Sequence, residues 1–158
     1  LGVSARLLGA RITLEDFMPT LLGLCGLAIP KQVEGLDYSG YLRGADDPSD
    51  GAALVACPAP FGQWIRRIGG REYRGLRTER YTYVRDLKGP WLLLDNQADP
   101  YQLKNLVGQP EHARVQADLE ARLQARLRQA RDQFLPAEPY IRQWNYTVDR
   151  NGTVPYTP

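Results

Sequence analysis

The alternation of hydrophobic and polar residues is clearest within residues 72–107, where it predicts three consecutive antiparallel strands. Residues 73–77 and 81–85 are rich in residues that fit a pleated, half-buried surface, and the polar residues between them predict a short hairpin connection. A third run covers 91–94. Pro100 follows it and ends the pattern, because proline cannot donate a hydrogen bond to a neighbouring strand. The segment therefore predicts an antiparallel meander.

A fourth strand is predicted at 52–57, where a short apolar run lies between Gly51 and Pro58. We expect it to join the meander in one small sheet. Residues 58–70 have no periodicity and are expected to form an irregular loop.

The longest helix is predicted within 110–135, where apolar residues recur at every third or fourth position. The apolar stripe consists of Val115, Leu119, Leu123, Leu127, Ala130 and Phe134. Such a stripe should lie across the meander. Residues 136–158 contain aromatic residues without periodicity, so we expect an extended tail held against the body.

An N-terminal helix is predicted between Thr13, which can form a capping box with Asp16, and Gly26, which can end it. Apart from Thr20, its body is apolar almost all round. A helix of this kind needs cover on more than one side. If the segment is isolated, the apolar surface of 16–26 offers a route to self-association.

Composition narrows the classes of partner. The chain has 158 residues, 43% of them hydrophobic, and a net charge of +2, which predicts one core, no membrane span and no nucleic-acid partner. Between Arg66 and Lys88, however, basic residues outnumber acidic ones, which favours an anionic neighbour. Cys25 and Cys57 are too few for a disulfide scaffold and are expected to be ordinary thiols.

Catalytic chemistry is poorly supported by the residues present. His112 is the only histidine, which excludes a histidine-based triad or a multi-histidine zinc site within this chain. Asp46 and Asp47 precede Pro48 and match no calcium-loop spacing, so a solvated turn is expected. We predict neither catalytic nor metal-ligating residues.

The irregular loop carries the candidate binding residues Trp64, Arg66 and Arg67. Aromatic and arginine side chains together can hold an anionic sugar, because a guanidinium pairs bidentately with a sulfate or a carboxylate. Two alternatives remain open at this point. The aromatic residues could pin the loop to its own core, or the arginines could pair with acidic residues of another domain.

Two stretches resemble a known family. The meander reads YRGLRTERYTYVRDL and then LLLDNQADPYQLKNLVGQPEH, which resembles the C-terminal segment of the sulfatase family of the alkaline-phosphatase-like superfamily. Upstream, LEDFMPTLLGLCGLAIPKQVEGLDYSGYLRG resembles a second segment of that family, in the right order. Gln102 stands where the family often has Glu, and Thr82 where it often has Lys.

The resemblance implies an α+β fold with three parts. Residues 1–50 would be the tail end of an N-terminal catalytic α/β domain, 51–135 a four-stranded antiparallel sheet with one long helix packed across it, and 136–158 the tail. The partners implied are that catalytic domain and an anionic, sulfated small molecule or glycan. The compartment is left open.

The same resemblance implies chemistry that lies upstream. Sulfatases use a Cys/Ser-x-Pro-x-Arg motif, whose first residue becomes formylglycine, beside a calcium ion. Cys57 is followed directly by Pro58 and the arginine is absent, so it does not match this motif. We therefore predict the C-terminal part of a sulfuric ester hydrolase that is inactive alone, with calcium and formylglycine in the preceding domain. The alternatives are a related phosphonate or phosphodiester hydrolase and a non-catalytic α+β interaction module.

Overall fold

The computed structural model describes residues 9–60 and 64–150. The chain divides into two compact units, Leu1–Ala53 and Leu54–Pro158. The first contains the N-terminal helices, and the second contains most of the sheet and the later helices.

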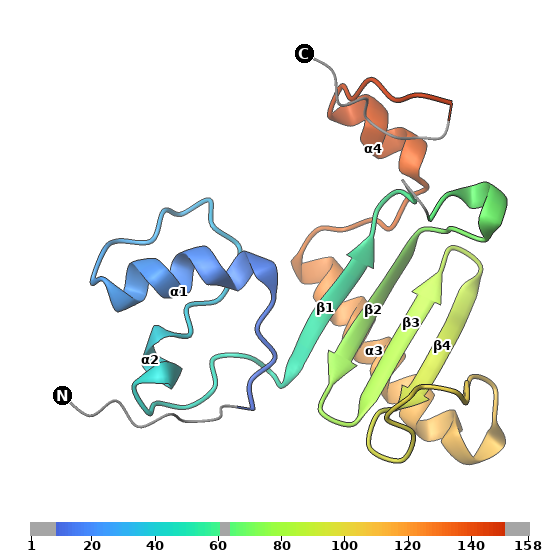
Figure 1. Cartoon of the computed structure of the whole chain (residues 1–158), viewed down its shortest axis with the longest axis horizontal. Coiled ribbons are helices and arrows are strands. Elements are labelled where there is room, and N and C mark those ends of the chain that lie inside the picture. Colours follow the sequence, from blue (N-terminus) through green and yellow to red (C-terminus); the bar gives the residue numbers. More distant parts are fainter. Residues whose placement is uncertain (1–8, 61–63, 151–158) are drawn as a thin grey trace. The chain divides into compact units, whose positions relative to one another are not determined.

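The second unit is built on a four-stranded sheet (Figure 1). Its strands are β1 (Ala52–Cys57), β2 (Tyr73–Thr78), β3 (Tyr81–Asp86) and β4 (Gly89–Asp95), and they lie side by side in chain order. Neighbouring strands run antiparallel, as the arrows in Figure 1 show. The predicted α+β fold class, including the fourth strand, is confirmed.

Helix α3 (Ala113–Gln129) covers one face of this sheet, and Figure 1 shows it behind the strands. Leu76 of β2 is aligned with Tyr83 of β3, which is aligned with Leu93 of β4, and all three are completely buried. The Tyr83 hydroxyl donates to Glu120 Oε2 of α3 at 2.5 Å, so this row faces the helix. The buried helix residues are Leu119, Leu123 and Leu127. The core of the unit therefore lies between α3 and the sheet.

The long helix ends earlier than the periodicity predicts. A 3₁₀ turn, η3 (Pro110–His112), precedes it, but α3 stops at Gln129 and Arg131 adopts a left-handed conformation with φ 54°. Just beyond, Asp132 pairs with Arg74, which is 2% exposed. Pairing of a buried guanidinium outweighs one more turn of helix, because an unpaired buried charge is strongly destabilising. Phe134 therefore lies outside the helix, with its ring centroid 4.9 Å from the Arg74 guanidinium carbon.

The C-terminal tail is not extended throughout, in contrast to the prediction. Residues Ala137–Gln143 form the helix α4, while 151–158 lie outside the described residues. The Tyr140 hydroxyl donates to Asp132 Oδ1 at 2.9 Å and accepts the Leu135 N–H at 3.1 Å. These bonds hold α4 against the segment that follows α3. The sequence did not predict this helix, because the pattern of apolar residues carries no information about hydrogen bonds between polar groups.

The segment that follows β4 in the sequence LLLDNQADPYQLKNL folds back and covers the edge of the sheet at β4. Asn105 Oδ1 accepts the Leu93 N–H at 3.0 Å, and Asn105 Nδ2 donates to the Trp91 carbonyl at 2.9 Å. The Leu106 N–H donates to the Leu93 carbonyl at 2.8 Å. Covering an edge in this way satisfies backbone groups that would otherwise pair with another chain. The motif that carries the family resemblance therefore has a structural role here.

The first unit contains η1 (Leu14–Asp16), α1 (Phe17–Leu24) and the short α2 (Ser39–Leu42). The predicted helix start is confirmed: Asp16 Oδ2 accepts the Thr13 N–H at 2.8 Å. Asp16 Oδ1 also accepts the Leu36 N–H at 2.7 Å.

Within residues 9–60 and 64–150, none of the helices has the length and apolar composition that a membrane span requires.

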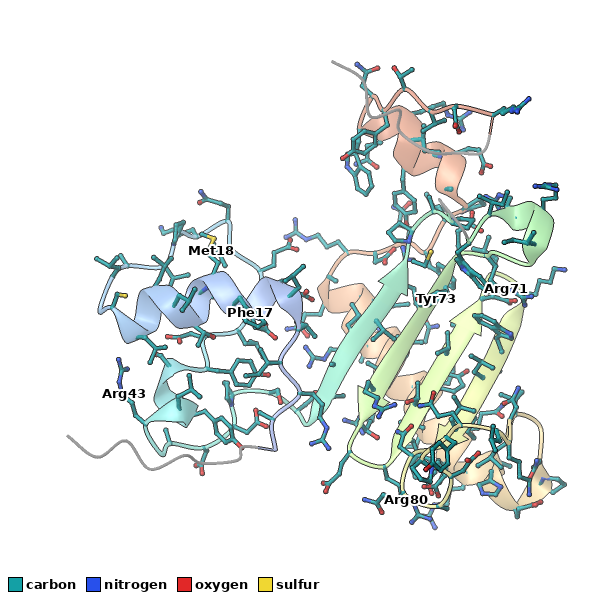
Figure 2. The ribbon with its side chains drawn as sticks, viewed as in Figure 1. Phe17, Met18, Arg43, Arg71, Tyr73 and Arg80 are labelled. Atoms are coloured by element: carbon teal, nitrogen blue, oxygen red, sulfur yellow. The ribbon has the colours of Figure 1, made fainter. Side chains whose placement is uncertain are left out.

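The buried residues of α1 are Pro19 and Thr20, and Asp16 of the preceding turn is buried beside them, while most of the large apolar side chains of α1 are exposed. Asp16 and Thr20 are 5% and 7% exposed, whereas Phe17 and Met18, labelled in Figure 2, are 58% and 51% exposed. The Thr20 hydroxyl accepts the Tyr38 N–H at 3.0 Å, which ties the helix to the following loop. The other exposed apolar residues of this segment include Leu14, Leu21, Leu24 and Leu27. We call this set, with Phe17 and Met18, the α1 surface.

Candidate functional site

The predicted binding loop folds back on itself before β2. It contains the 3₁₀ turn η2 (Arg66–Ile68), closed by the Gly70 N–H, which donates to the Ile65 carbonyl at 2.9 Å. Gly69 has φ 97°, and a Cβ added to Gly70 would lie 2.1 Å from the Trp64 carbonyl oxygen. Only glycine permits this close return, which places Trp64 beside the start of β2.

Arg66 is held by acidic groups of its own unit. Its Nη1 donates to Glu72 Oε2 at 2.8 Å, and its Nη2 contacts Glu72 and Glu138. Glu72 is 1% exposed. Burial opposes its ionisation, but the bonds from Arg66 and from the Ala137 N–H outweigh burial and lower the pKa of Glu72 below its usual value. Arg66 is therefore a positioning group between η2, β2 and α4.

Arg67 and Trp64 have different surroundings. Arg67 is exposed and, among residues 9–60 and 64–150, forms no ion pair. Trp64 is 40% exposed and stacks on Trp91 of β4, with ring centroids 6.4 Å apart and planes 20° from parallel. The structure thus brings Trp64 onto the sheet, while Arg66 is engaged elsewhere.

Two further residues join Trp64 at this corner. The Arg71 guanidinium carbon lies 4.4 Å from the Trp91 ring centroid, and Arg71 Nη1 pairs with Asp86 Oδ2 at 3.0 Å. The Tyr73 ring lies 6.0 Å from that of Trp91. We call Trp64, Arg71, Tyr73 and Trp91 the aromatic corner; Figure 2 labels Arg71 and Tyr73 at one end of the sheet.

The aromatic corner lies on the face of the sheet opposite α3. Successive side chains of a strand point to opposite faces, and Arg74 reaches Asp132 on the α3 side, so Tyr73 points the other way. Asp86, the cross-strand partner of Tyr73, lies on the same open face and meets Arg71. The sequence did not identify Arg71 and Trp91, because the contacts of the aromatic corner join residues that are far apart in the chain. The excess of arginines after Arg66 did include Arg71.

No hydrolytic centre is assembled in the described part of the chain. Groups of three or more His, Cys, Asp or Glu side chains able to hold a metal ion are absent from residues 9–60 and 64–150. Burial, followed by the charge of Glu72, raises the pKa of the Cys57 thiol, which disfavours the nucleophilic thiolate.

Comparison with known proteins places this geometry in a family. The family described as N-sulphoglucosamine sulphohydrolase, C-terminal, matches residues 9–130. An ulvan-active sulfatase of Formosa agariphila is 38% identical over 148 residues, which cover 93% of this chain and 28% of the relative. The chain thus spans little more than a quarter of that relative's length.

Solved structures agree on the fold. A 2-O GAG sulfatase superposes with a TM-score of 0.64 at 26% identity, covering 84% of this chain and 28% of the other. A phosphonate monoester hydrolase from Silicibacter pomeroyi superposes with a TM-score of 0.52 at 26% identity, covering 90% of this chain and 29% of the other. The sulfatase resemblance predicted from the two motifs is confirmed, and the chain belongs to the C-terminal family of N-sulphoglucosamine sulphohydrolase, within the sulfatases.

Proposed function

We propose that this chain is the C-terminal module of a sulfuric ester hydrolase that acts on a sulfated glycan. The observation that carries the proposal is the 38% identity to a named sulfatase over 93% of the chain. The module itself would be non-catalytic, and formylglycine and calcium would belong to the preceding domain.

The partner of the module would be its own N-terminal catalytic domain. The α1 surface supports this, because a helix that buries Asp16 and exposes Phe17, Met18 and Leu21 is stable only if something covers its apolar side. Residues 1–50 would then form the last helix and loop of the catalytic domain. The same surface is the one through which an isolated chain would self-associate.

We also propose that the loop carrying Trp64, Arg66 and Arg67 contributes to the rim of the substrate cleft. Arg66, bonded to Glu72, would act by holding the loop in place. Arg67 and Trp64 remain exposed enough to meet an anionic sugar. The competing role for Arg67 is an ion pair with an acidic residue of the catalytic domain.

The full-length protein tests this function directly. Its gene should encode Cys/Ser-x-Pro-x-Arg upstream of Leu1, and the purified enzyme should be assayed on a panel of ulvan oligosaccharides, 2-O-sulfated glycosaminoglycan disaccharides, 4-nitrophenyl sulfate and a phosphonate monoester. We expect sulfate release, abolished by replacing the first residue of that motif with alanine. Turnover of the phosphonate ester alone would favour the second candidate, which the similarity to a phosphonate monoester hydrolase keeps open. An enzyme with neither activity would favour a non-catalytic module.

The rim role of Arg67 needs two substrates. In the full-length Arg67→Ala variant, loss of a glycan contact should lower kcat/KM for the glycan and spare 4-nitrophenyl sulfate. Loss of an interdomain ion pair should lower the melting temperature and affect both substrates equally.

A further inference from the structure

The aromatic corner carries an inference that rests on the proposed function. We propose that Arg71, with Trp64 and Trp91, forms a binding subsite for an anionic pyranose unit of the glycan, one that bears a sulfate or a carboxylate. Tyr73 contributes to the subsite through its tilted ring contact with Trp91.

The Arg71 guanidinium is already oriented for an anion. One of its faces lies over the Trp91 ring at 4.4 Å, Nη1 is bonded to Asp86, and Nε reaches the Gly69 carbonyl at 3.4 Å. Within the described residues, Nη2 has no hydrogen-bond partner, and the side chain is 40% exposed. A planar guanidinium held on two sides loses little conformational entropy when an anion binds the remaining edge.

The ion pair alone does not account for this arrangement. An ion pair whose arginine lies at the surface is screened by solvent and adds little to stability. Here the aspartate is largely buried, with its side chain 12% exposed, while the arginine is left at the surface. Asp86 also accepts the Lys88 N–H at 2.8 Å and so serves the β3–β4 turn whether or not Arg71 is present. Arg71 is therefore the member of the pair that is available to a ligand.

The tryptophans supply a surface suited to a sugar ring. Trp64 and Trp91 are nearly parallel, and Trp64 is 40% exposed although it packs against another aromatic ring. A pyranose has an apolar face of C–H groups, which packs on an aromatic ring, and a polar edge, which a neighbouring cation can bind. An aromatic wall with one guanidinium beside it therefore fits a charged sugar better than it fits an apolar ligand.

The sheet offers a matched control at its other end. Arg80 also lies over an aromatic ring, that of Tyr81, at 5.1 Å, and also pairs with a buried carboxylate, that of Asp95, at 2.8 Å. It lacks a second exposed tryptophan, and Figure 2 shows Arg71 and Arg80 at opposite ends of the sheet. Arg80→Gln therefore reproduces the structural loss expected of Arg71→Gln without touching the subsite.

The decisive experiment uses the full-length enzyme, the sulfated oligosaccharide of the panel that it turns over best, and 4-nitrophenyl sulfate. Arg71→Gln should raise KM for the oligosaccharide by about 10- to 100-fold, the loss expected for a charge-assisted contact. Trp64→Ala should raise the same KM by about 3- to 10-fold, because it removes an aromatic packing surface. Both variants should leave turnover of 4-nitrophenyl sulfate nearly unchanged. Arg71→Gln should lower the melting temperature no more than Arg80→Gln does, and Arg80→Gln should leave turnover of both substrates unchanged. Arg71→Lys should recover part of the affinity, because it retains the charge but not the planar edge.

Direct binding separates failure of the subsite from failure of the proposed function. Tryptophan fluorescence is titrated with the sulfated oligosaccharides of the panel and with their desulfated forms. If the wild type releases sulfate but Arg71→Gln binds and turns over the oligosaccharide like Arg80→Gln, the subsite is wrong and the function stands. If the wild type releases no sulfate yet binds the sulfated form through Arg71, the function is wrong and the subsite stands. An equal loss on both substrates would make Arg71 structural and overturn the subsite.

Discussion

The carboxylate of Glu72, the residue before β2, accepts the N–H of Ala137, the first residue of α4, at 2.8 Å. The two residues are 65 positions apart. Because Glu72 also holds Arg66, one buried carboxylate joins the candidate loop, the sheet and the C-terminal helix. The geometry of the loop therefore depends on the tail.

Replacing Glu72 should release the tail. In Glu72→Ala, the Ala137 N–H loses its acceptor and Arg66 loses its main ion-pair partner. An unsatisfied buried donor lowers the unfolding free energy by about 1–3 kcal/mol. We expect a loss of unfolding free energy in that range and faster proteolysis within residues 137–150. The control is Glu111→Ala, at an exposed position. Identical denaturation midpoints and proteolysis rates for the two variants would contradict this role.

The stability of the second unit should fall in acid. Burial raises the pKa of Glu72, but the bonds from Arg66 and the Ala137 N–H outweigh burial and lower it. Burial likewise raises the pKa of Asp132, but the bonds from Arg74, the Phe134 N–H and Tyr140 outweigh it and lower this pKa as well. The unfolded chain then binds more protons than the folded one as pH falls below about 4.3. The stabilisation is complete above that pH and is lost through the lowered pKa values.

Unfolding free energies measured between pH 3 and pH 7 test this dependence. The unfolding free energy of the wild type should fall steeply below pH 4.3. Glu72→Gln should have a lower unfolding free energy at pH 7, and that energy should fall less steeply with decreasing pH below 4.3. A variant slope as steep as that of the wild type would show that other groups control acid unfolding.

The packing of α3 should be sensitive to charge at Leu123 and not at a neighbouring exposed position. Leu123 is completely buried between the helix and the sheet, so Leu123→Asp places a carboxylate in an apolar core and should cost more than about 4 kcal/mol. Ala125→Asp introduces the same residue at an exposed position of the same helix and should cost less than about 1 kcal/mol. Equal melting temperatures would mean that α3 does not pack as described.

The 158-residue segment should neither hydrolyse 4-nitrophenyl sulfate nor bind calcium. The reason is chemical: Cys57 lacks the Cys/Ser-x-Pro-x-Arg context, and His112 is the only histidine. Turnover is measured against a heat-denatured sample and calcium binding by calorimetry. Sulfate release above the denatured background would show that the nucleophile lies within the segment.

Isolated segments should associate through the α1 surface. Light scattering after size exclusion should show a mass that rises with concentration, because Phe17 and Leu21 are each 58% exposed. The double variant Phe17→Ser, Leu21→Ser should lower the association. Leu103→Ser, at a position that is 85% exposed but outside α1, is the control. A wild type that stays monomeric at all concentrations would contradict the prediction.

The sequence by itself determined the elements whose signals are local. The strands at 73–77 and 81–85 and the start of the helix at Thr13 were predicted within a residue or two, because β propensity and capping act between near neighbours. That α1 needs cover beyond its own loop remains a prediction. The neighbouring places of β2, β3 and β4 followed from the short connections between them, whereas a 15-residue loop, 58–72, separates β1 from β2.

Tertiary structure alone decided the end of α3, the helix α4 and the identity of the residues at the aromatic corner. The apolar periodicity through Phe134 favoured a longer helix. In the structure α3 ends at Gln129, because Asp132 pairs with the buried Arg74. Likewise, Arg66 and Arg71 cannot be distinguished by residue type; Arg66 meets Glu72, while Arg71 meets the Trp91 ring. Their roles are set by which charges and rings the fold brings within a few ångströms, and a buried charge must be paired before local helical preference can be satisfied.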